Sequence, residues 1–208
     1  MANMSARPFL VLEGVDLSGK TTIAALLAQE LGAKLMKSPP FPFETIKQSV
    51  LECAAPLARF CYFIASNTQI SKMASDVLAN QPVVCDRYIW STIAYHSAIE
   101  NIPPQGLVNI VEPLIGSLRM PNLVVFLRVS RQAQLVRAKN KVDDQLQRNL
   151  LVSERFQQEL NEAYEKTKEL IQAPCIEVDT SESSISESVQ EIIAEIKKKF
   201  NQSPFSEK

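Results

Sequence analysis

Short apolar runs alternate along the chain with longer segments of helical periodicity. The runs cover residues 9–12, 35–36, 83–85, 123–129 and 176–178. Continuous apolar runs of this length are typical of strands that are buried on both faces of a parallel sheet. Alternation of such strands with helices predicts an α/β fold with helices on both faces of the sheet. We therefore expect three layers, with a five-stranded parallel sheet between two layers of helices.

The segments between the runs carry start and stop signals of helices. Pro56 is suited to the first turn of a helix, and the chain then runs without glycine or proline to Asn80. A long amphipathic segment, 143–171, predicts a helix broken near Ser153. Ser184 and Glu187 form a capping box that predicts a last helix. We expect one domain over residues 1–200 and a disordered polar tail over 201–208.

Composition restricts the partners of the protein. The chain has 208 residues with 22 basic and 23 acidic side chains, a net charge of −1, which argues against a general nucleic-acid or anionic-membrane surface. No segment approaches a membrane-spanning length, and the N-terminus lacks a long apolar leader. The four cysteines include no C-x-x-C pair, which favours buried, reduced thiols. We expect a cytoplasmic protein that binds neither nucleic acid nor membrane.

Residues 14–21 read Gly-Val-Asp-Leu-Ser-Gly-Lys-Thr and match the phosphate-binding loop G-x-x-x-x-G-K-[ST]. A predicted strand precedes the loop and a predicted helix follows it, so backbone N–H groups and the helix N-terminus can face a polyphosphate. Lys20 is expected to reach the β- and γ-phosphates, and Thr21 to bind Mg²⁺. The alternative without a function is a strand-to-helix turn with an incidental lysine. The expected ATP-binding residues here are Gly14, Val15, Asp16, Leu17, Ser18, Gly19, Lys20, Thr21 and Thr22.

Asp86 and Arg87 follow the predicted strand 83–85, at the strand end where open α/β sheets bind ligands. A carboxylate there can hold Mg²⁺ through water, and an arginine can bind phosphate oxygens. We therefore expect Asp86 to share the metal with Thr21, and Lys20, Asp86 and Arg87 to act in catalysis. A surface ion pair at a helix start is the alternative.

A basic segment at 131–148 predicts a helical lid. Lys20 is the only basic residue of the loop 14–21, and phosphoryl transfer needs positive charge around the transferred group. A lid that closes over ATP can supply it. Arg137 is the preferred catalytic candidate, and Arg131 is a second ATP-binding candidate. A solvated helix face explains the same charges without any function.

Three blocks together resemble the thymidylate kinase family. Residues 13–22 resemble its E-G-x-D-x-x-G-K-[ST]-T motif, residues 86–95 its D-R-[YH]-x-x-S-x-x-A-[YF] motif, and residues 121–127 its P-D-L-x-x-x-L strand, with Asn122 in place of aspartate. The resemblance implies a P-loop kinase that transfers a phosphoryl group from MgATP to a pyrimidine nucleoside monophosphate. It also implies a homodimer that forms through the helix around 57–80.

The resemblance also assigns acceptor-binding residues. It places Asp16 at the acceptor sugar, Arg87 near the phosphates and Tyr95 near the sugar or base. Phe63, in a block similar to F-x-A-x-R, would stack on a pyrimidine, although core packing explains it nearly as well. His96 would contact the base edge, and its alternative is a partly exposed helix residue.

Two arginines of the family pattern are missing. Asn67 stands where the F-x-A-x-R block has arginine, and no arginine occurs in 37–42 after the second predicted strand. Other features, including Arg59 followed by Tyr62, resemble the UMP/CMP kinase branch named for its mitochondrial animal member. In that branch Arg59 would supply the acceptor-phosphate charge; a solvent-exposed arginine is the alternative.

The acceptor is therefore open among dTMP, dUMP, UMP and CMP. A deoxynucleoside kinase is the nearest alternative, because the loss of two arginines suits an acceptor without phosphate. A regulatory P-loop nucleotide-binding module is an alternative of another class.

Overall fold

The computed structural model describes residues 7–141 and 153–201. A single parallel sheet of five strands forms its centre, in the order β2-β3-β1-β4-β5. The strands are β1 (Phe9–Gly14), β2 (Lys34–Lys37), β3 (Val83–Asp86), β4 (Leu123–Arg128) and β5 (Cys175–Asp179). Each coincides with a predicted apolar run, so the predicted five-stranded parallel sheet is confirmed.

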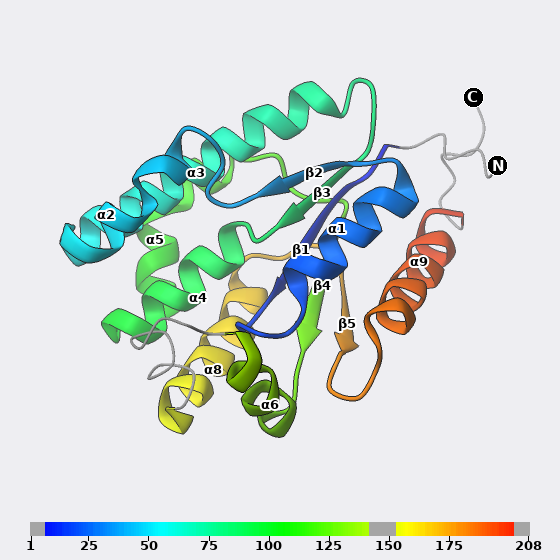
Figure 1. Ribbon diagram of the computed structural model, residues 1–208. Helices are drawn as coiled ribbons and strands as arrows, with labels where there is room; N and C mark the ends of the chain where they lie inside the picture. Colours follow the sequence, from blue (N-terminus) through cyan, green and yellow to red (C-terminus); the bar gives the residue numbers. More distant parts are fainter. Residues whose placement is uncertain (1–6, 142–152, 202–208) are drawn as a thin grey trace.

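Helices cover both faces of the sheet, which gives the expected three layers (Figure 1). Along the chain they are α1 (Lys20–Leu31), the 3-10 turn η1 (Phe43–Ile46), α2 (Lys47–Cys53), α3 (Pro56–Val77), α4 (Ile89–Glu100), α5 (Pro104–Ile115), α6 (Arg131–Lys141), α8 (Glu154–Leu170) and α9 (Ile185–Asn201). Helices α1 and α9 pack on one face, whereas α3, α4, α5 and α8 pack on the other.

Alternate side chains of the buried strands divide the core into two clusters. Leu10 and Leu12 of β1 pack with Leu27 of α1 and Ile192 of α9 on one face. Phe9 and Val11 face the opposite way, toward the helices of the other layer. This alternation is the period of two that a strand imposes, and it requires apolar residues at successive positions when both faces are covered.

Local signals in the sequence set several helix boundaries. Pro56 opens α3, as predicted, although the helix ends at Val77, before Asn80. The capping box at the start of α9 is confirmed, because Ser184 N donates to Glu187 Oε2 (2.8 Å) and Glu187 N donates to Ser184 Oγ (3.2 Å). Ser153 caps α8 by accepting from the amide of Phe156.

Parts of the sequence predictions lie outside the described residues. These are the lid segment 142–148, the tail 202–208 and the first six residues of the predicted domain. Within the described ranges, no helix is long and apolar enough to cross a membrane.

The expectation of buried cysteines is wrong for three of the four. Cys85 in the central strand β3 is buried, whereas Cys53, Cys61 and Cys175 are exposed. Cys53 ends the short helix α2, Cys61 lies on the outer side of α3, and Cys175 begins the edge strand β5. Edge positions and outer helix faces leave a side chain in solvent even when the surrounding sequence is apolar.

Candidate functional site

The loop between β1 and α1 turns sharply at two glycines. Gly14 has φ 135°, and a Cβ there would lie 2.3 Å from the Leu127 carbonyl oxygen of β4. Gly19 has φ 92° and immediately precedes α1. Both conformations favour glycine, because a Cβ clashes with its own backbone at these angles. The turn delivers Lys20 and Thr21 to the first turn of α1, as the motif predicts.

Lys20 lies inside the loop. Its ammonium group donates to the Val15 carbonyl (2.5 Å) and to Ser18 Oγ (3.2 Å), and the residue is buried. Burial, and next the neighbouring Arg87, lower the pKa of Lys20 to about 7. A bound polyphosphate would favour the charged form, because opposite charges at close range raise the pKa of a lysine.

Thr21 and Asp86, the two expected metal ligands, contact each other. Thr21 Oγ1 donates to Asp86 Oδ2 at 2.6 Å, and Asp86 is buried. Asp86 Oδ1 is also buried and has no hydrogen-bond partner among the described residues. A hydroxyl and a carboxylate with a free oxygen are hard ligands of the kind that Mg²⁺ prefers. The two residues therefore fit a magnesium ion, held directly or through water.

Arg87 lies between the loop and α4. Its φ of 72° is rare for a residue with a side chain. It forms an ion pair with Asp16, donates to Ser91 Oγ (3.1 Å), and lies 4.8 Å above the ring centre of Tyr95. Burial alone would raise the pKa of Asp16, but Arg87 and Lys20 outweigh it and hold this pKa below its ordinary value. The structure thus brings Asp16, Arg87 and Tyr95 together.

Glu13 is a buried carboxylate that the sequence analysis assigned no separate role. It accepts hydrogen bonds from the amides of Tyr88 (2.8 Å) and Ser91 (3.2 Å) at the start of α4, and from the Ser91 hydroxyl. Burial raises the pKa of Glu13 to about 7, although these hydrogen bonds and Arg87 act in the opposite direction. The sequence signal that could have indicated a role for Glu13 is the presence of an acidic residue at the end of an apolar strand.

Tyr164 is a site residue that no motif indicated. It lies on α8, and its hydroxyl donates to the Gly14 carbonyl (3.0 Å) and contacts Ser91 Oγ (2.8 Å). Its ring packs edge-on against Tyr95, with centroids 6.2 Å apart. Since it occurs 150 residues after Gly14, only the tertiary structure shows that the two meet.

Helix α6, the described part of the predicted lid, contacts the loop. Arg137 Nη1 donates to the Leu17 carbonyl (2.9 Å), and the guanidinium group also donates to Thr180. Arg131 donates to Gln134 Oε1 (2.7 Å), and Gln134 in turn donates to the Asp16 carbonyl (3.0 Å). In this structure Arg137 therefore contacts the loop through a backbone carbonyl of the loop.

Aromatic rings surround His96 in the expected acceptor region. The rings of Phe60 and Phe63 lie 5.2 Å and 5.5 Å from it, both edge-on. His96 is buried, so a partly exposed helix residue is the wrong description. Burial lowers its pKa, and Nδ1 lies 2.8 Å from the Thr92 carbonyl, which can only accept. In the neutral ring Nε2 is therefore left as an acceptor.

The two remaining expected acceptor residues differ in their surroundings. Asn67 is completely buried; its amide nitrogen donates to Thr92 Oγ1 (2.8 Å), and its carbonyl oxygen has no partner among the described residues. Arg59 forms an ion pair with Glu100. Its charge is therefore compensated within the protein, and its side chain is only partly exposed (24%).

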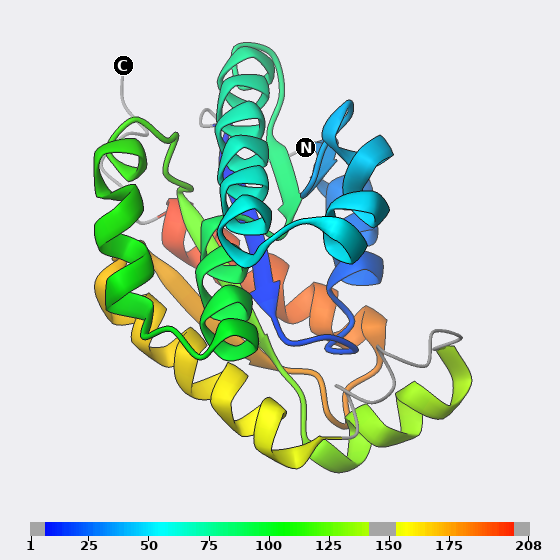
Figure 2. The same cartoon turned by 90° about the vertical axis from the view of Figure 1, so that its left-hand side faces the viewer.

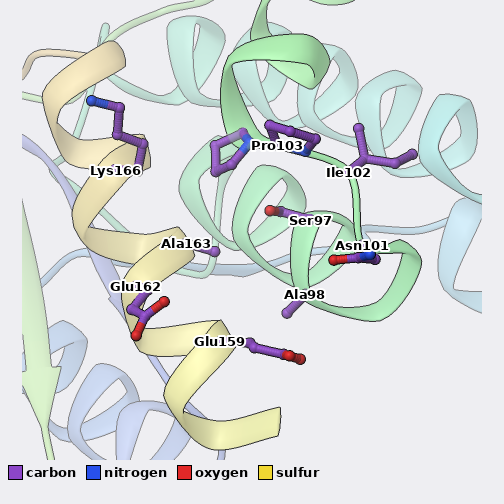
Figure 3. Close-up of a pocket in the computed structure, with 10 residues that line it drawn as sticks. Ser97, Ala98, Asn101, Ile102, Pro103, Glu159, Glu162, Ala163 and Lys166 are labelled. Carbon is purple, nitrogen blue, oxygen red and sulfur yellow. The ribbon is translucent and has the colours of Figure 1, made fainter. Parts of the chain in front are cut away.

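A cavity of about 300 Å³ lies between α4 and α8 (Figure 3). None of the predicted site residues lines it. Its wall consists of the end of α4, the connection to α5 and the polar side of α8, including Ser97, Asn101, Pro103, Glu159, Glu162 and Lys166.

Comparison with known sequences gives a consistent set of relatives. A sequence model described as thymidylate kinase matches residues 12–192. A probable thymidylate kinase of Methanocaldococcus jannaschii is 28% identical over 197 residues, covering 91% of this chain and 95% of the relative. A thymidylate kinase of Coprothermobacter proteolyticus is 31% identical over 168 residues, covering 76% and 84%.

Solved structures share the fold. Thymidylate kinase from Candida albicans superposes with a TM-score of 0.75 at 24% identity, covering 95% of this chain and 94% of the other. Deoxyadenosine kinase from M. mycoides superposes with a TM-score of 0.67 at 20% identity, covering 91% and 98%. Since both identities are low, these similarities concern the architecture alone.

Proposed function

This chain belongs to the thymidylate kinase family and is a nucleoside monophosphate kinase, and we propose that it phosphorylates dTMP to dTDP with MgATP. One observation carries the proposal. Lys20, Thr21, Asp86 and Arg87, which come from two distant motifs, gather at the carboxyl edge of adjacent parallel strands. This edge is where open α/β sheets bind their ligands.

The proposed reaction is a direct transfer of the γ-phosphoryl group to an oxygen of the acceptor phosphate. The amides of the loop and Lys20 would bind the donor phosphates, and Arg87 would lie between donor and acceptor. Thr21 and Asp86 would hold Mg²⁺, which neutralises negative charge on the phosphates when it is bound. Catalysis then consists of holding the two nucleotides in line and stabilising the charge of the transferred group.

The acceptor phosphate also needs positive charge, and two lysines near Arg87 are suited to supply it. Lys37 ends β2 and is paired in register with Asp86 of β3. Lys47 is half-buried at the start of α2. Burial, and then Lys37 and Arg87, lower the pKa of Lys47. Neither lysine forms an ion pair with a described residue. Asp16 and Glu44 act on the pKa of Lys47 in the opposite direction without forming an ion pair with it. Cations held this close together favour an anionic ligand.

These lysines replace Arg59 in the proposal. Arg59 already has a carboxylate partner in Glu100. Its guanidinium group would have to break this ion pair before it could bind a phosphate. Lys37 and Lys47 offer charge that no carboxylate within ion-pair distance compensates in the described part of the chain. A monophosphate acceptor is therefore compatible with the absence of the two family arginines.

Phe63, Asn67 and His96 are proposed to hold the acceptor base, with Asp16 and Tyr95 near its sugar. The unpartnered Asn67 Oδ1 and the acceptor Nε2 of His96 both require N–H donors. Thymine supplies one such donor at N3, which can serve one of these two atoms. The Asn67 amide orientation follows from its bond to Thr92, whose hydroxyl points at the Tyr88 carbonyl (3.5 Å).

We further propose a cytoplasmic homodimer. Large apolar side chains are exposed on α3 and α5, among them Leu57 (61% exposed), Ile110 (56%) and Leu114 (45%). Burial of such side chains against a second copy would remove apolar surface from water. Light scattering of the wild type and a Leu57→Glu variant tests the dimer: the wild type should have twice the monomer mass, and the variant should dissociate more readily.

An ADP-release assay with dTMP, dUMP, dCMP, UMP, CMP and thymidine tests the proposed activity. We expect the highest kcat/KM with dTMP and little turnover of thymidine. Preference for thymidine would instead favour a nucleoside kinase. A folded protein that binds ATP or GTP but turns over none of these acceptors would favour a regulatory module.

A further inference from the structure

Side chains bind the backbone carbonyls of the phosphate-binding loop throughout residues 14–18. Lys20, from within the motif, donates to Val15. The other four carbonyls accept hydrogen bonds from residues more than one hundred positions away. The pairs are Tyr164 Oη to Gly14 O (3.0 Å), Gln134 Nε2 to Asp16 O (3.0 Å), Arg137 Nη1 to Leu17 O (2.9 Å) and Thr180 Oγ1 to Ser18 O (2.9 Å).

Three of these donors are buried polar residues. Gln134 is 3% exposed, Tyr164 4% and Thr180 2%. A buried polar group is stable only when it is hydrogen-bonded, because otherwise its lost hydration is not replaced. The loop carbonyls provide these groups with partners, so each contact stabilises a single arrangement of the donor and the loop.

The donors are also connected to one another. Gln134 donates to Gln157 Oε1 on α8 (2.9 Å), and Arg137 donates to Thr180 Oγ1 (3.3 Å). Through these bonds α6, α8 and the segment after β5 hold the loop together. In Figure 2, α6 and the start of α8 lie near the loop that follows β1.

The direction of the carbonyls determines the direction of the amides. In a trans peptide the C=O and the following N–H point to opposite sides of a rigid plane. The carbonyls of Gly14, Asp16, Leu17 and Ser18 are held by α6, α8 and the segment after β5. The N–H groups that follow them therefore point away from these elements, toward the interior where a polyphosphate would bind. N–H donors that are already oriented before binding need little reorganisation when the negatively charged polyphosphate binds.

We propose that Gln134, Tyr164 and Thr180 are positioning residues, which hold the loop carbonyls outward and so direct its amides toward the donor triphosphate. The inference rests on the proposed ATP-dependent function of the same site. It assigns a role to the buried polar residues of α6, α8 and the β5–α9 connection that the three family motifs do not contain.

An isosteric pair of variants tests this role. Thr180→Val removes the hydroxyl that lies 2.9 Å from the Ser18 carbonyl and 3.0 Å from the Arg128 carbonyl of β4. Thr167→Val is the matched control, because Thr167 is also buried and donates to a carbonyl, that of Ala163 within α8 (2.6 Å). We expect Thr180→Val to raise Kd and KM for MgATP by about three- to tenfold, with KM for dTMP within about twofold of the wild type. The control should leave all three constants within about twofold.

Tyr164→Phe provides a second variant that keeps the ring and removes only the hydroxyl. It should weaken MgATP binding in the same direction, and it decides the question if Thr180→Val does not fold. Unchanged MgATP affinity in folded Tyr164→Phe and Thr180→Val proteins would overturn the inference while dTMP kinase activity of the wild type stands. A wild type that does not bind ATP would instead overturn the proposed function, and the inference with it.

Discussion

At the scale of single residues, the site consists of buried ionisable groups in mutual contact. Burial raises the pKa of Glu13 and lowers that of Lys20, both to about 7, because it disfavours the charged form of either group. Arg87 contacts Asp16 and Ser91 close to both. Perturbed pKa values of this kind gather at functional sites.

The pH dependence of stability should reveal Glu13. Its pKa in the folded protein is about 7, above the ordinary 4.5, so the folded state holds an extra proton between these values. The stability that this group contributes is complete below pH 4.5 and is lost as the pH rises through 7. Glu13→Gln keeps a neutral side chain throughout.

Urea unfolding from pH 4.5 to 7 checks this prediction. The stability of Glu13→Gln relative to the wild type should increase by up to about 1.4 kcal/mol per pH unit. A difference that is constant over this range would contradict a raised pKa at Glu13.

Lys47 should contribute to binding of the acceptor phosphate. Lys47→Met removes one charge, and we expect KM for dTMP to rise about tenfold or more, as for a lost bond to a charged group, while KM for MgATP changes little. Lys47→Arg should restore most of the affinity. Lys34→Met, at the opposite end of β2, is the control for charge alone.

The competing assignment gives the opposite pattern. If Arg59 binds the acceptor phosphate, Arg59→Met should raise KM for dTMP and Lys47→Met should not. Steady-state kinetics of the three methionine variants distinguishes the two assignments.

Sequence motifs predicted the residues that we propose contact a bound phosphate, but not those that support them. Lys20 and Arg87 stand in short blocks whose spacing is set by the local turn, so the pattern is visible in the sequence. Gln134 and Tyr164 reach the loop only after β1, β4 and the helices have packed together. A single buried glutamine or tyrosine has no periodic signature that distinguishes it from ordinary core or surface residues.

At the scale of elements, the apolar runs predicted the strands because both faces of the sheet are covered. The helices were harder to delimit, since α3 ends at Val77 without a glycine or proline stop. The cysteine prediction was wrong because composition does not show which side of a helix faces solvent. Register and strand order, β2-β3-β1-β4-β5, depend on packing over long sequence distances.

The close approach of β4 to the end of β1 gives an element-scale prediction. Gly14→Ala would place a Cβ 2.3 Å from the Leu127 carbonyl and force an alanine to φ 135°. We expect a loss of more than about 2 kcal/mol in the free energy of unfolding, because strain and overpacking add. Gly116→Ala, where a Cβ would meet nothing within 4 Å, is the control. Equal stabilities of the two variants in denaturant titration would contradict this view of the loop.

At the scale of the whole molecule, parallel strands place the ends of β1 and β3 at one edge of the sheet, and helices from the C-terminal half complete the site from outside. The family motifs all lie before residue 128, whereas Gln134, Tyr164 and Thr180 follow them in the sequence. Donor binding thus depends on contacts that span nearly the entire described structure.

Transfer of labelled phosphate tests the central claim most directly. Incubation with [γ-³²P]ATP, Mg²⁺ and dTMP should produce labelled dTDP with the wild type. Lys20→Met should reduce the rate at least about a hundredfold, because the positive charge that Lys20 places beside the transferred group is lost. Label that appears in inorganic phosphate alone, or equal rates for the wild type and a folded Lys20→Met protein, would contradict the account.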